Sequence, residues 1–101
     1  MYVDLSSGTA VVRKAEDLKS LSVVSPGGVP DASALGQLGV VEGGHVWLSV
    51  SALRAAAAAT VPEADREPWL GAFDGMIAYA TSKGWTDESG TRVRAHVEAT
   101  A

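Results

Sequence analysis

Residues 60–97 read TVPEADREPWLGAFDGMIAYATSKGWTDESGTRVRAHV and carry the most regular pattern in the chain. Apolar side chains recur there at intervals of three and four, which places them on one face of a helix. Thr60 and Glu63 have the spacing of a capping box at a helix start. Gly84 stands where a left-handed residue ends a helix, which brings Trp85 back near Ala80. The stretch predicts a long amphipathic helix whose stripe is Trp69, Phe73, Met76, Ile77 and Ala80.

The start of this helix has two interpretations. Pro62 suits a first turn because proline lacks the N–H that would be unpaired there. Asp65, Glu67 and Pro68 repeat these start signals one or two turns later. Either one helix begins at Pro62, or two helical pieces meet near Pro68.

A turn over residues 86–90 leads into alternating residues from Thr91 to Glu98. Alternation predicts a strand with one apolar and one polar face. The apolar face consists of Val93, Ala95 and Val97, which suffices to define the strand. The opposite face is polar and consists of Arg92, Arg94, His96 and Glu98. The alternation does not require these particular residues, so this face is the best candidate site.

The N-terminal third predicts short strands. Residues 1–14 indicate a hairpin around the Ser6-Ser7-Gly8 turn. Residues 15–21 are compatible with a helical turn, and residues 21–24 with a further strand. The Pro- and Gly-rich residues 25–30 form a loop.

The middle of the chain predicts two helices around one strand. Asp31 is placed to cap a short helix that runs through Leu38 and ends at Gly39. Residues 45–50 form a strand on which Val46, Leu48 and Val50 share a face. Ser49 or Ser51 then caps an alanine-rich helix that extends to about Ala59.

We therefore expect one domain, residues 1–101, of α+β class. The prediction is a small, mainly antiparallel sheet covered on one face by the alanine-rich helix and the longer amphipathic C-terminal helix. A homodimer is expected because so short a chain buries a limited part of its apolar surface.

Composition excludes several classes of site and partner. The sequence has no cysteine, which excludes disulfides and thiolate chemistry and favours a reducing cytoplasm. The net charge is −4 without a basic stripe, so we expect neither nucleic acid nor a membrane surface as partner. We expect no signal peptide and no membrane span, since no apolar run approaches about 20 residues. Abundant alanine and scarce lysine indicate a bacterial protein.

His45 and His96 are the candidate catalytic residues. Histidine suits general acid–base work near neutral pH. Each points away from its neighbouring valine, so the two imidazoles meet if their strands pair in the right register. The alternative is that both are ordinary surface histidines of a strand.

Arg92 and Arg94 are candidates for holding a carboxylate or phosphate. Glu98 on the same face either joins the ligand site or simply balances their charge in solvent. Trp47 shares a face with His45, so it is a candidate wall of an apolar ligand pocket or part of an interface. If the sheet is covered on both faces, Trp47 is instead part of the core.

No metal and no cofactor are expected. His45, His96 and Glu98 offer at most three zinc ligands, and two arginines on the same face would repel a cation. The glycine pairs at residues 27–28 and 43–44 lack the form of a phosphate-binding loop.

The leading functional hypothesis is a small soluble binding or accessory module that acts through a protein interface or a small apolar ligand. The alternative is a cofactor-free lyase or isomerase. It would use His45 or His96 as acid–base, with Arg92 or Arg94 as anion clamp and Trp47 as pocket wall. The enzyme hypothesis requires both histidines to line one concave pocket, with Trp47 on its wall.

Overall fold

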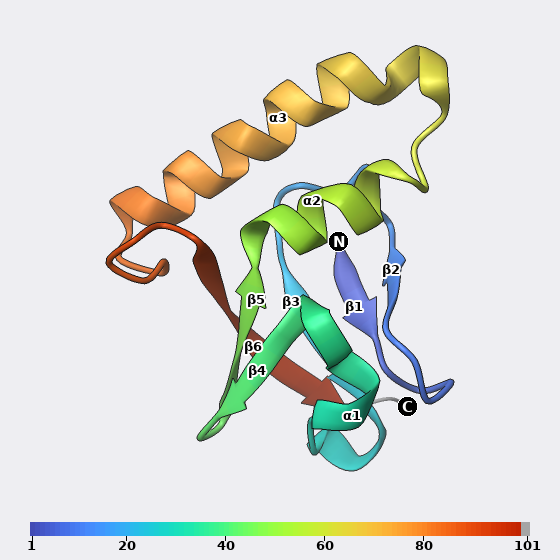
Figure 1. Ribbon diagram of the computed structural model, residues 1–101, viewed down its shortest axis with the longest axis vertical. Coiled ribbons are helices and arrows are strands. Elements are labelled where there is room, and N and C mark those ends of the chain that lie inside the picture. The colour runs from blue at the N-terminus through green and yellow to red at the C-terminus, as the bar shows by residue number, and fades with distance from the viewer. Residues whose placement is uncertain (100–101) are drawn as a thin grey trace.

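The computed structural model describes residues 1–99 and shows an α+β fold on one mixed six-stranded sheet (Figure 1). The strand order is β2-β1-β3-β6-β5-β4. Three neighbouring pairs are antiparallel, whereas β1–β3 and β3–β6 are parallel. The strands are β1 (Tyr2–Asp4), β2 (Val11–Arg13), β3 (Ser22–Ser25), β4 (Gly39–Glu42), β5 (His45–Ser49) and β6 (Arg92–Ala99).

The two parallel pairings were not part of the sequence prediction. The predicted hairpin is present as β1 and β2, but β3 then lies on the other side of β1 and runs parallel to it. A parallel neighbour requires a long connection instead of a tight turn, and the connection from β1 to β3 runs over residues 5–21 and includes β2. Alternation within a strand gives no information on which strand becomes its neighbour.

The helical turn expected over residues 15–21 is wrong. This segment is irregular because its backbone groups are engaged elsewhere. The carbonyls of Asp17 and Ser20 accept hydrogen bonds from the Met1 amino group at 2.6 and 3.1 Å. The carbonyl of Ala15 accepts one at 2.7 Å from the indole N–H of Trp69. The segment is therefore fixed by long-range contacts.

The short helix α1 (Ala32–Leu35) begins as predicted. The Asp31 carboxylate accepts hydrogen bonds from the backbone N–H groups of Ser33 and Ala34. It ends earlier than expected, at Gly36, and a 3₁₀ turn continues to Leu38. Strand β4 follows and was missed, since Val40 and Val41 are too short an apolar run to indicate a strand alone.

The two longer helices are α2 (Val50–Ala58) and α3 (Glu63–Ser82). Ser49 caps α2 by accepting a hydrogen bond from Ala52 N–H at 3.3 Å. The predicted capping box at Thr60 is wrong, because its hydroxyl donates to the carbonyl of Ala57 and Pro62 starts α3 without a side-chain cap. One helix continues through Pro68, whose missing N–H removes a single i→i−4 hydrogen bond.

The end of α3 agrees with the prediction. Gly84 has φ +77°, a left-handed conformation that glycine adopts without steric cost. The backbone N–H of Trp85 donates to the carbonyl of Ala80 at 2.9 Å, the long bond of a Schellman motif.

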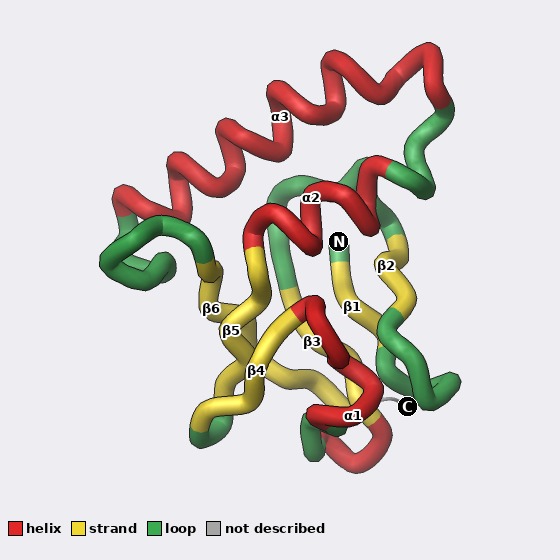
Figure 2. Tube along the Cα trace, in the orientation of Figure 1, coloured by secondary structure: helices red, strands yellow, loops and turns green. Residues whose placement is uncertain are grey.

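The core lies between one face of the sheet and the helices (Figures 1 and 2). Phe73 of α3, Leu53 of α2, and Val46 and Leu48 of β5 are all fully buried in one core cluster. The predicted alternation holds, with Val93 and Ala95 buried and Val97 half-buried. The other face of β5 and β6 remains open and carries the polar residues.

Candidate functional site

The open face of β5 and β6 brings the predicted residues into register. The antiparallel pairing sets His45 opposite His96, Trp47 opposite Arg94 and Ser49 opposite Arg92. Directly opposite residues on one face have Cβ atoms roughly 4.5–5.5 Å apart. The two histidines are therefore cross-strand neighbours, as the enzyme hypothesis requires.

The other edge of β6 is paired in two separate places. Its second half pairs with β3, starting at Ser22 opposite His96. Its first half pairs with residues 85–86, through a bridge between Thr86 and Val93 and a 2.8 Å hydrogen bond from Arg94 N–H to the Trp85 carbonyl. A break remains between these partners, and a pocket occupies this position.

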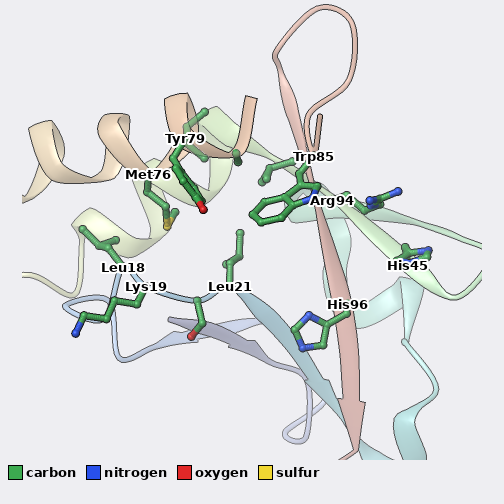
Figure 3. A pocket seen from close by; sticks show the side chains of 13 residues that line it. Leu18, Lys19, Leu21, His45, Met76, Tyr79, Trp85, Arg94 and His96 are labelled. Atoms are coloured by element: carbon green, nitrogen blue, oxygen red, sulfur yellow. The ribbon is translucent and has the colours of Figure 1, made fainter. Parts of the chain in front are cut away.

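The pocket has a volume of about 380 Å³ (Figure 3), within the range of small-molecule sites. Residues 18–21 and α3 provide its mainly apolar side, and β5 and β6 provide its polar side. The lining residues are Leu18, Lys19, Ser20, Leu21, His45, Met76, Ile77, Tyr79, Ala80, Trp85, Val93, Arg94 and His96.

Trp85 forms a fixed aromatic wall of this pocket. Its backbone is hydrogen-bonded on both sides, to Ala80 of α3 and to Arg94 of β6. Its ring packs edge-on against Tyr79 at 6.0 Å between centroids. Yet Trp85 and Tyr79 remain 42% and 57% exposed. Large aromatic surfaces held open at a concavity are typical of ligand sites.

Two basic side chains, Lys19 and Arg94, line the pocket. Its ionisable lining residues are Lys19, Arg94, Tyr79 and the two histidines, and no aspartate or glutamate lines it. The chain as a whole carries −4, so this region differs from the average surface. Among residues 1–99, the arginine–carboxylate ion pairs are Arg13–Asp4 and Arg54–Asp74, and the third close contact is His96–Glu98, so the Arg94 guanidinium is unpaired.

His96 and Glu98 form a side-chain pair beside the pocket. The Nε2 atom of His96 lies 2.9 Å from Oε1 of Glu98. If the carboxylate accepts the Nε2 proton, Nδ1 of the neutral ring is left as a proton acceptor. The arrangement is that of a histidine oriented by a carboxylate.

The structure brings only some of the predicted site residues to the pocket. His45, His96 and Arg94 line it, whereas Trp47, Arg92 and Glu98 do not. Trp47 is half-buried on the open face of β5, opposite Arg94. The backbone N–H of Arg92 donates to the Asp87 carboxylate.

Sequence reasoning missed most of the apolar lining. Met76 and Ile77 were predicted as core, but both are only half-buried because their part of the α3 stripe faces the pocket. Trp85 was explained by helix packing alone. Its position directly after a glycine helix stop, a place that does not require an indole, was the available signal.

Within residues 1–99, no three potential metal ligands of the His, Cys, Asp or Glu type are grouped to hold an ion. The helices of the same region include none with the length and apolarity to cross a membrane.

Comparisons of the chain with protein-family models, with curated proteins and with solved structures give no significant match.

Proposed function

We propose that this protein is a binding module for a small, largely apolar ligand held between α3 and β6. The observation that carries the proposal is the pocket of about 380 Å³ at the break in the β6 edge. Leu18, Leu21 and Met76 give it an apolar side, and Trp85 gives it a flat aromatic wall.

The half-exposed lining supports this proposal energetically. Met76 and Ile77 belong to a helix stripe whose other members, Trp69, Phe73 and Ala80, are buried. Apolar surface left in water costs roughly 25 cal/mol per Å² relative to burial. A ligand seated in the pocket completes the burial of this stripe.

A neutral apolar probe tests the proposal. We expect N-phenylnaphthylamine to bind the protein by calorimetry and Met76→Lys to abolish that binding. Val29→Lys is the matched control, because it introduces the same charge at an exposed loop position outside the pocket. Absence of probe binding, or equal binding by M76K and V29K, contradicts the proposal.

A cofactor-free lyase or isomerase is the second candidate. It is favoured by the direct pairing of His45 with His96 and by the contact between His96 and Glu98. In this function His96 Nδ1 takes a proton from the substrate, Glu98 orients the ring, and Arg94 holds an anionic group.

Proton exchange tests the second candidate. Aryl-substituted keto acids are incubated with the protein in D₂O, and loss of the proton next to the carbonyl is followed by NMR. Exchange by the native protein that disappears in His96→Gln supports catalysis. No exchange above buffer leaves the binding module as the function.

We also propose a homodimer in which β4 of one protomer pairs with β4 of a second copy. Strand β4 is an edge of the sheet, and its Val40 and Val41 are exposed. Exposed apolar edges favour pairing with another strand. Light scattering should give twice the monomer mass for the native protein and the monomer mass for Val41→Lys. A native monomer at high concentration contradicts the dimer.

A cytoplasmic location remains part of the proposal and is supported by the cysteine-free sequence. Cell fractionation with a periplasmic marker tests it. Release of the protein with that marker contradicts it.

A further inference from the structure

We infer that the ligand of this pocket is an amphipathic monoanion, an apolar body that bears one carboxylate, with the carboxylate directed to Arg94. This inference rests on the proposed binding function and specifies the chemical class of the ligand.

The pocket has a mainly apolar end, which also holds Lys19, and a polar end that holds Arg94 and the two histidines. In Figure 3, Leu18, Leu21, Met76 and Tyr79 lie on one side of Trp85, and Arg94 and His45 lie on the other, with His96 below. A ligand that spans both ends needs an apolar part against the first group and a polar part at the second. The indole face of Trp85 lies between them and suits a flat or aliphatic body.

Arg94 is the group best placed to bind the polar part. Its backbone is fixed by the hydrogen bond to the Trp85 carbonyl, and its position on β6 is fixed by pairing with Trp47. The guanidinium takes part in no ion pair with residues 1–99. Arginine stays charged at all physiological pH values and binds a carboxylate with two parallel hydrogen bonds.

The surrounding charges favour a single negative charge. His96 is already engaged by Glu98, and Glu42 lies opposite His45 on β4. Arg94 is the one arginine or lysine at this end of the described pocket, and its guanidinium makes no ion pair with residues 1–99. Lys19 lies at the apolar end, on residues 18–21. The fork of one arginine matches the two oxygens of one carboxylate, whereas the second charge of a phosphate would have no further arginine or lysine to pair with at this end.

The pocket volume limits the size of the apolar body. At the packing density of protein interiors, about 380 Å³ accommodates on the order of fifteen non-hydrogen atoms. Naphthylacetate is of this size, and its amide and its phosphate counterpart, naphthyl phosphate, have nearly the same shape. The set varies the charge of the ligand while holding the apolar body nearly constant.

Binding of this set to three proteins tests the inference. We expect the native protein to bind naphthylacetate at least about tenfold more tightly than naphthylacetamide and than naphthyl phosphate. Arg94→Gln should remove the preference for the carboxylate and leave amide binding unchanged. Arg92→Gln is the matched control, since Arg92 is on the same strand face but outside the pocket, and it should keep the preference.

Failures of the inference and of the proposed function are distinguishable. In one outcome N-phenylnaphthylamine binds, but naphthylacetate and naphthylacetamide bind equally, or R94Q keeps the preference for the carboxylate. This outcome overturns the monoanion inference and leaves the proposed binding function in place. Tighter binding of the phosphate also overturns the inference. If no probe binds the native protein, both are wrong. Circular dichroism of R94Q shows whether this variant keeps its fold. Arg94→Lys retains the positive charge and should keep part of the preference for the carboxylate.

Discussion

His45 of β5 lies directly opposite His96 of β6, and both side chains line the same pocket. Cross-strand neighbours on one sheet face interact, whereas residues far apart on it do not. We predict a coupling of roughly 0.5–1 kcal/mol between His45→Ala and His96→Ala in a double-mutant cycle of urea unfolding.

The control for this cycle pairs His45→Ala with Arg92→Ala, two positions on the same face that lie four residues apart in register. Their effects should add within about 0.5 kcal/mol. Additivity in the histidine cycle would contradict the pairing of β5 with β6 in this register.

We expect the Asp4 carboxylate to make a contribution to the free energy of unfolding that is lost in acid. Hydrogen bonds from the Ser6 hydroxyl and backbone N–H, together with the Arg13 guanidinium at 2.8 Å, lower the pKa of the Asp4 carboxyl from 3.8 to about 2. A lowered folded-state pKa stabilises the fold above the unfolded value of 3.8, and this contribution disappears as the pH falls through about 2.

Asp4→Asn should therefore lower the free energy of unfolding by about 1 kcal/mol near neutral pH, a figure reduced for solvent screening. The difference from the native protein should vanish in strong acid. Urea titrations at several pH values measure this difference, and a pH-independent difference would exclude the carboxylate as its cause.

We expect the stability of the protein to depend on the left-handed backbone conformation of Gly84 at the end of α3. Gly84→Ala should destabilise the protein by about 1–2 kcal/mol, because a Cβ atom disfavours the φ of +77° even though no neighbour obstructs it. The matched control is Gly75→Ala inside α3, also unobstructed. This change should stabilise the protein by about 0.5–1 kcal/mol. Effects of the same sign in both variants would contradict the Schellman ending.

We expect the buried side chain of Trp69 to hold residues 15–21, part of the pocket wall, in place. Trp69→Phe removes the buried hydrogen bond to the Ala15 carbonyl and should cost about 1–3 kcal/mol. Hydrogen–deuterium exchange should rise in residues 15–21, which include the pocket-lining Leu18 and Leu21. Trp47→Phe, outside this contact, should leave that exchange unchanged.

Local signals in the sequence were reliable where one or two neighbouring hydrogen bonds determine the structure. Asp31, Ser49 and Gly84 mark helix ends because their partners lie within five residues. The alternation in β6 likewise identified the face that carries Arg94 and His96. Thr60 shows the limit of such signals, since its hydroxyl found a nearby carbonyl in place of the expected backbone N–H.

The pocket could not be predicted because it depends on contacts between distant segments. Arg92 and Arg94 are equivalent in the sequence pattern, and only the positions of residues 85–86 and of β3 along β6 distinguish them. For the same reason Trp85 lines the pocket, whereas Trp47 does not. The break in the edge of β6 arises from two partners that the sequence does not place next to each other.

Trp85 is bound through its backbone to a helix on one side and to a strand on the other. The central wall of the pocket is therefore preorganised by regular secondary structure and does not depend on a mobile loop. A ligand that contacts the indole orders little additional protein, so its binding loses little conformational entropy on the protein side. Affinity at such a site is governed mainly by how well the ligand's own shape and charge match a surface that already exists.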